Sequence, residues 1–179
     1  VRMGMCQLAG EIADGVLLDF LVPPSYNDLA MGAVRQGAKI SGRSMNDFDV
    51  PQLIAASVDD KEPQKAIDDC KQFLTQYIAQ QPHIAEFCGA EPELVARIQE
   101  TLGWPATKVE IRRGMDLVSN ELTQRVAACG TASQALDKMV EWHDHGCTEG
   151  VITPLGADAY ETLDQLAAKA NLKKHGGVR

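Results

Sequence analysis

Four side chains that can ligate a metal crowd into the stretch HDHGC: His143, Asp144, His145 and Cys147. Imidazole nitrogen and thiolate sulfur are ligands that zinc prefers in proteins. On a helix, however, side chains two residues apart point in nearly opposite directions, so His143 and His145 cannot readily hold one ion. We therefore interpret the stretch as the end of a helix, where the helix dipole favours imidazoles, and we predict no metal site.

The five cysteines are widely spaced and include no C-x-x-C pair. This pattern indicates neither a disulfide framework nor a zinc ribbon. We expect the thiols to be buried as small apolar side chains in a reducing compartment, the cytoplasm. Glu11 and Asp14 are near enough along the chain for an acid–base pair, but their place before the turn at Gly15 favours a solvated surface. These patterns assign no catalytic residue.

The chain is acidic, with 179 residues, a formal net charge of −8 and a pI near 4.9. Binding to a phosphate backbone requires a basic face, so we exclude nucleic acid and anionic membranes as partners. No apolar run approaches the roughly 20 residues that span a bilayer. With 45% apolar residues, the chain has enough hydrophobic surface for one packed domain of ordinary size.

Three short runs of residues are the predicted strands. Residues 15–20 (GVLLDF) are mostly apolar without alternation, as in a parallel sheet that is covered on both faces. Residues 50–58 (VPQLIAASV) and 150–156 (GVITPLG) are the second and third, and Pro51 must lie at a strand start, where no ladder donor is lost. Helical stretches separate the runs, which predicts an α/β fold with a parallel sheet built from β-α-β crossovers.

Helices are predicted where apolar residues recur every three or four positions. Ser25, with Asp28 three residues on, is expected to cap a helix that ends at Gly42. Thr131 and Gln134 form a T-x-x-Q capping box at the start of another helix. Further helical stretches are residues 8–14, 63–78, 91–102, 107–115 and 160–170, with 61–126 interpreted as a helical insertion and 173–179 as a disordered tail.

Three stretches resemble the luciferase-like monooxygenase superfamily: MCQLAGEIADGVLLDF, YNDLAMGAVRQGAKISGR and AACGTASQALDKMVEWHDHGCTEGVITPLG. The resemblance covers nearly all of residues 1–172 and is strongest to a branch of deazaflavin-dependent reductases, the methylenetetrahydromethanopterin reductases. It implies a TIM-type (β/α)8 barrel of about twice this length. Residues 15–20, 51–58 and 150–156 would then be strands six, seven and eight, and the first five strands would precede Val1.

The resemblance also implies a cofactor, FMN or the deazaflavin coenzyme F-420, at the carboxyl end of the barrel. In the family, backbone amides at the start of the helix after strand five hold part of its phosphate side. Arg2, Gly4 and Met5 occupy that turn here and are expected to bind the cofactor, although Met3 stands where Pro is common. Asp19 ends strand six, where binding residues gather, and is expected to bind the cofactor too.

The end of the eighth strand is expected to line the substrate mouth through Thr153, Pro154, Leu155 and Gly156. The resemblance implies hydride transfer between the reduced cofactor and a small organic substrate. In the family, the protonating His and the acidic residues that face the cofactor lie on strands before Val1, so none is assigned here. The alternative is a non-catalytic α/β module that associates with other copies. In either case we expect a homo-oligomer or association through apolar barrel edges.

Overall fold

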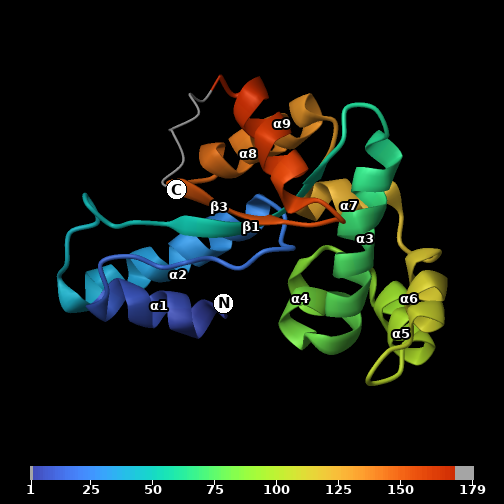
Figure 1. The fold of residues 1–179 in the computed structure, drawn as a ribbon. Helices are drawn as coiled ribbons and strands as arrows, with labels where there is room; N and C mark the ends of the chain where they lie inside the picture. Colours follow the sequence, from blue (N-terminus) through green and yellow to red (C-terminus); the bar gives the residue numbers. More distant parts are fainter. Residues whose placement is uncertain (1, 172–179) are drawn as a thin grey trace.

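The computed structural model describes residues 2–171, which form nine helices and three strands (Figure 1). The expected tail at residues 173–179 lies outside the described residues. The elements in chain order are α1 (Met3–Ile12), α2 (Ser25–Ser41), β1 (Pro51–Val58), α3 (Pro63–Gln80), α4 (Pro82–Phe87), α5 (Pro92–Thr101), α6 (Lys108–Met115), α7 (Asn120–Val126), β2 (Ala128–Gly130), α8 (Ala132–Asp144), β3 (Glu149–Pro154) and α9 (Ala159–Lys169).

The sheet is parallel, as predicted, with strand order β2-β1-β3. Ala56 of β1 lies opposite Ala128 of β2 and Pro154 of β3, so the three strands end at the same edge. In Figure 1 the strands run across the view from left to right, and helices α3 to α7 lie beyond their carboxyl ends. The elements that follow the strands therefore meet at one edge of the sheet.

The predicted strand at residues 15–20 is only partly correct. Gly15 pairs with Asp49 and Leu18 with Gln52, but these are two isolated parallel bridges and not a continuous strand. The chain turns away at Leu21, whose φ is 59°, in the left-handed region. Farther along the same side of β1, the short strand β2 forms the ladder. The sequence did not predict β2, because three residues carry no readable periodicity.

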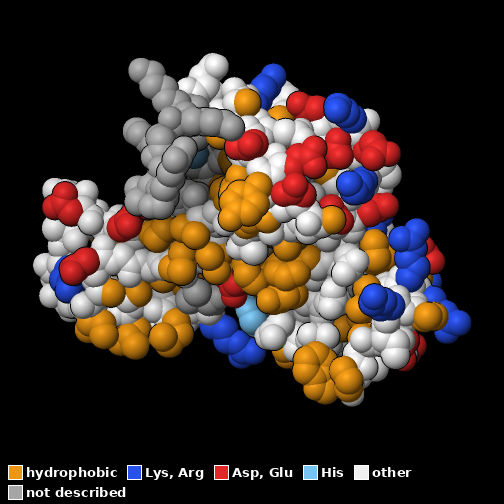
Figure 2. All heavy atoms as spheres, in the orientation of Figure 1, with side chains coloured by type: hydrophobic (Ala, Val, Ile, Leu, Met, Phe, Trp, Pro, Cys, Tyr) orange, Lys and Arg blue, Asp and Glu red, His pale blue; other side chains and the backbone are white. Residues whose placement is uncertain are grey.

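The two faces of the sheet differ in their cover. On one face, Ile54 and Ala56 pack in a buried cluster with Trp142 of α8 and Leu166 of α9. On the other face, α3 covers only the carboxyl end of β1. Leu17 and Val151 are 48% and 39% exposed, and hydrophobic side chains gather over the strands and along α1 (Figure 2). The second face is therefore an apolar surface that residues 2–171 leave open.

Helices α1 and α2 cross very closely, because glycines lie at the contact. A Cβ on Gly10 would stand 2.0 Å from the carbonyl oxygen of Val34, and one on Gly37 would stand 1.9 Å from that of Gln7. No side chain fits in either position. This packing holds the second half of α1 against the second half of α2.

Most predicted helices are present, with some corrections. Ser25 does not cap α2; Pro24 takes that place without a side-chain bond, while Gly42 ends the helix at φ 69° as expected. The Thr131–Gln134 capping box is confirmed. Helices α4 and α7 were not predicted, since each is too short to show a period. Among residues 2–171, no helix is long and apolar enough to cross a membrane.

Candidate functional site

Polar and aromatic side chains gather at the carboxyl ends of the strands. Ligands of parallel α/β folds bind outside these ends, where the loops converge. Asp19 follows the last bridge of residues 15–18, Ser57 lies near the end of β1, and Gly156 follows β3. This edge is therefore the candidate site.

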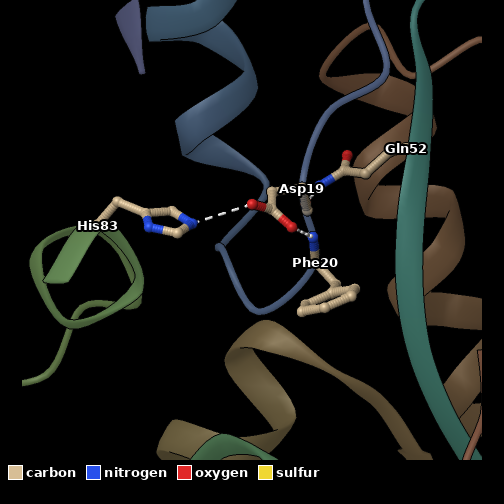
Figure 3. Close-up of polar contacts among 4 residues, drawn as sticks. All are labelled: Asp19, Phe20, Gln52 and His83. Atoms are coloured by element: carbon tan, nitrogen blue, oxygen red, sulfur yellow. Dashed lines mark hydrogen bonds and ion pairs between the residues drawn. The ribbon is translucent and has the colours of Figure 1, made fainter. Parts of the chain in front are cut away.

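Asp19 is held by contacts on both carboxylate oxygens (Figure 3). The backbone N–H of Phe20 donates to Oδ1 at 3.1 Å. The second oxygen, Oδ2, lies 3.0 Å from Nε2 of His83, and the two side chains are 24% and 27% exposed. His83 comes from α4, so this contact joins α4 to the segment that follows the bridges at residues 15–18.

A buried chain of amides fixes the backbone of Asp19. Nε2 of Gln52 donates to the carbonyl oxygen of Asp19 at 3.2 Å, and Nδ2 of Asn27 donates to Oε1 of Gln52 at 2.7 Å. Both amide side chains are fully buried. Oδ1 of Asn27 has no partner among the described residues. Burying amides costs free energy unless they are bonded, so this arrangement holds Asp19 in place at a cost to stability.

An aromatic cluster lies beside Asp19. Phe20 contacts Phe73 and Tyr77 of α3, with ring centroids 5.1 and 5.0 Å apart. Helix α4 is docked in the same region, because Phe87 packs edge-on against Tyr26 at 5.2 Å. These contacts keep His83 and Phe20 in fixed positions relative to Asp19.

A depression of about 270 Å³ opens next to this cluster, between α3 and the turn after β3. Gly156 has a φ of +96°, and a Cβ there would stand 2.6 Å from Oδ2 of Asp69. The hydroxyl of Ser57 donates to that same oxygen at 3.1 Å. The lining residues are Asp69, Gln72, Phe73, Gln76, Leu155 and Gly156. The site thus combines carboxylate, amide and aromatic groups, which suit a flat polar ligand.

The first turn of α1 is open to an anion. Arg2 precedes the helix with extended backbone angles, and no side chain caps it. Arg2 and Gly4 are exposed, and a Cβ on Gly4 would meet nothing within 4 Å. Met5 is also exposed, but its N–H is already bonded to the carbonyl of Arg2 at 2.9 Å. The available donors are therefore Arg2 and the N–H groups ahead of Met5.

Buried ionisable groups connect α1 with Asp19. Burial raises the pKa of the Tyr26 hydroxyl, and the Cys6 thiol and the Asp19 carboxylate raise it further. Burial likewise raises the pKa of the thiols of Cys6, Cys88 and Cys147. All five cysteines are buried, as predicted. Neutral thiols are poor nucleophiles, so Cys6, Cys88 and Cys147 act as packing residues.

The stretch HDHGC has the structure expected of a helix end. His143 lies in the last turn of α8, and its Nδ1 is 3.1 Å from the carbonyl of Cys147. His145 pairs instead with Asp28 of α2 at 2.9 Å. Among residues 2–171, no group of three His, Cys, Asp or Glu side chains could hold a metal ion.

A larger cavity, of about 450 Å³, lies at the opposite end of β3, between α8 and α9. Its walls are mainly apolar, including Ile54, Leu136, Met139, Ile152, Leu163 and Leu166. His143, Thr148 and Glu149 also line it, but its surface is mostly apolar, whereas polar groups predominate in the depression at the carboxyl ends of the strands. We therefore place the candidate site at the carboxyl ends of the strands.

The structure brings some of the predicted site residues together. Asp19 and the pair Leu155 and Gly156 border the same edge, while Thr153 and Pro154 lie within β3, leading into that turn. His83 was not predicted, since a lone histidine after Pro82 gives no indication of a partner 64 residues earlier. Asp69 and Gln52 were missed for the same reason.

Parallel strands, helices on the outer face and a polar carboxyl-end edge define an α/β protein of the kind found in (β/α)8-barrel enzymes. The family model for luciferase-like monooxygenases matches residues 1–149, so the chain belongs to that family. The 5,10-methylenetetrahydromethanopterin reductases of Methanopyrus kandleri and Archaeoglobus fulgidus are 29% and 27% identical over 89% and 95% of this chain. The chain spans about half of their length, 45% and 51% respectively.

Solved structures give the same result. The coenzyme F-420-dependent tetrahydromethanopterin reductase of Methanopyrus kandleri superposes with a TM-score of 0.78 at 27% identity, covering 94% of this chain and 47% of that one. An F-420-dependent secondary alcohol dehydrogenase shares the fold, with a TM-score of 0.65 at 16% identity, covering 91% of this chain and 44% of that one. The predicted fold class, part of a TIM-type (β/α)8 barrel, is confirmed.

Proposed function

We propose that this chain is the C-terminal portion of a deazaflavin-dependent oxidoreductase. It would contribute strands six to eight of the barrel, with residues 61–126 as a helical insertion. The observation that supports this best is the match of 94% of the chain to an F-420-dependent reductase. Hydride would pass between reduced coenzyme F-420 and an organic substrate of the tetrahydromethanopterin class. The five free cysteines favour a cytoplasmic location.

The start of α1 fits the phosphate end of the cofactor. An uncapped helix of ten residues offers unpaired N–H groups and a partial positive charge, and the open space at Gly4 lets a phosphate approach the backbone. Arg2 would add a charged donor. When bound, the reduced deazaflavin supplies the hydride. The residues of this chain would hold and orient cofactor and substrate, which is the protein's main task in such chemistry.

The candidate site fits the substrate side. Phe73 and the amides of Gln72 and Gln76 line the depression by the turn after β3, and Leu155 and Gly156 close it. A planar, hydrogen-bonding substrate suits such a surface. The cofactor choice follows the same relatives, since the solved structure that is 27% identical to this chain is an F-420-dependent reductase; FMN remains the comparison to test.

The test is a fluorescence titration of the full-length protein that contains this chain, with F-420 and with FMN. Arg2→Gln should weaken F-420 binding about tenfold, because one charged hydrogen bond is lost. The control is Arg35→Gln, on the exposed surface of α2. Micromolar F-420 binding and oxidation of reduced F-420 by a methylenetetrahydropterin would support the proposal. A full-length protein that binds neither cofactor would instead support the non-catalytic alternative.

A further inference from the structure

The pair His83 and Asp19 is held more firmly than an ordinary surface ion pair. The backbone of Asp19 is fixed by Gln52, and its carboxylate by the N–H of Phe20. His83 is fixed through α4, where the neighbouring Ile84 is fully buried. Exposed ion pairs are mobile and contribute little to stability. A histidine held from both sides at the carboxyl edge of a parallel sheet is therefore suited to a task beyond surface pairing.

The contact with Asp19 also fixes which nitrogen of His83 faces a ligand. A carboxylate only accepts hydrogen bonds, so the Nε2 atom that it meets carries the proton. In the neutral imidazole, Nδ1 is then a bare acceptor. Within residues 2–171, no group is hydrogen-bonded to Nδ1, and the side chain is 27% exposed. The ring can therefore accept a hydrogen bond from outside.

The position of the pair connects it to the depression. Phe20 follows Asp19 directly and contacts Phe73, which lines the depression beside Gly156. Figure 3 shows His83 reaching Asp19 from α4 and pointing to the side of the carboxylate away from Gln52. A ligand that reaches His83 from the depression would have to extend past Phe73 and Phe20 to Asp19.

We propose that His83 is a specificity-determining residue that accepts a hydrogen bond from an N–H or O–H group of the organic substrate. Asp19 is its positioning residue, since it holds the imidazole in the acceptor tautomer. This inference rests on the proposed function and adds to it a contact from the helical insertion. It also explains why two buried amides support the backbone of Asp19.

The experiment compares His83→Gln with wild type in the full-length enzyme. Glutamine keeps a donor for Asp19 near the position of Nε2 but lacks the Nδ1 acceptor. We expect the KM for the methylenetetrahydropterin to rise about tenfold, with the affinity for F-420 and the melting temperature unchanged. This fold-change corresponds to about 1.4 kcal/mol. The matched control is His145→Gln, the same substitution in a second His–Asp pair, between α8 and α2, and it should leave KM unchanged.

The role of Asp19 is tested by ¹⁵N spectra of the histidine rings. Wild type should show His83 as the Nε2–H tautomer, and Asp19→Asn should mix the tautomers and raise KM as His83→Gln does. An active enzyme whose KM is the same in wild type and His83→Gln overturns the inference, and so does an Nδ1–H tautomer in wild type. A wild type that neither binds F-420 nor oxidises its reduced form overturns the proposed function itself.

Discussion

At the residue scale, position 156 requires a glycine for two reasons: its backbone angles, and the lack of room for a side chain. Its φ of +96° strains any other residue, and a Cβ would collide with Asp69. We expect Gly156→Ala to lower the free energy of unfolding by about 1–3 kcal/mol. Gly32→Ala is the matched control, because it lies in open space within α2 and should stabilise by about 0.5–1 kcal/mol. Urea denaturation measures both; equal effects would contradict this account.

The buried amides that support Asp19 should be energetically coupled. Gln52→Leu leaves Nδ2 of Asn27 and the carbonyl of Asp19 without partners, at an expected cost of about 1–3 kcal/mol. Asn27→Leu removes a side chain that already has one unpaired oxygen. The double variant should therefore be more stable than the sum of the single effects implies. A double-mutant cycle by urea denaturation measures the coupling, and simple additivity would show that the amides act independently.

Sequence reasoning predicted a binding role for Asp19, which stays a prediction, and did not predict its contacts with His83 and Gln52. Asp19 ends an apolar run, and the carboxyl end of a strand is a general place for binding residues. His83, Gln52 and Asp69 reach the site only through tertiary packing, which leaves no trace in local spacing. Their roles depend on distances that a single sequence does not contain.

At the element scale, the cap of α6 should respond to acid. Glu110 accepts bonds from the N–H and hydroxyl of Thr107, and these bonds lower the pKa of its carboxyl below the ordinary 4.5. A depressed folded pKa stabilises the fold above pH 4.5, and this stability is lost as pH falls through the folded value. Amide chemical shifts at the start of α6 should report this loss.

Glu110→Gln should remove the acid response of α6, because glutamine accepts the same bonds without titrating. The box at α8 provides an internal control, since Gln134 already occupies the equivalent position. The amide shifts at the start of α8 should show no transition from a titrating capping residue. If α6 of the variant still unwinds at the same low pH, the cap is not the titrating group.

The elements that could be predicted are those with a repeated period. Long amphipathic helices such as α3 and α8 show apolar stripes over several turns. Their first residues are also recognisable in the sequence, as a proline at the start of α3 and a capping box at the start of α8. The segment 15–20 was predicted as a full strand because its composition is that of one. Its pairing is cut short by the turn at Leu21, and β2 forms the ladder farther along that side of β1. Which segment pairs with this side of β1 depends on tertiary packing, so the local sequence does not predict it.

At the scale of the whole molecule, the open sheet face should promote association. Leu17 and Val151 are exposed on this face, and apolar patches of this kind rarely stay solvated. In residues 1–179 alone, Val151→Thr should weaken self-association. Val140→Thr is the matched control, since Val140 is 56% exposed on α8 and outside the face. Sedimentation velocity compares the variants; identical behaviour would place the contact elsewhere.

Residues 1–179 alone should show little or no cofactor binding and no hydride transfer. The proposed site draws its groups from several strands of a barrel, and the described residues supply three strands and two bridges. Correct positioning of reactants is worth about 7–11 kcal/mol of barrier in well-oriented reactions, so a site without most of its walls loses nearly all of that advantage.

Adding the half of the barrel that the relatives carry beyond this chain, on the same polypeptide or as a complementing fragment, should restore both binding and turnover. The face that bears Leu17 and Val151 would then be covered, and the first turn of α1 would meet the rest of the cofactor site. Fluorescence titration with F-420 and a reduction assay, run before and after complementation, measure the recovery. Micromolar binding with turnover by residues 1–179 alone would show that the reacting groups lie within this chain.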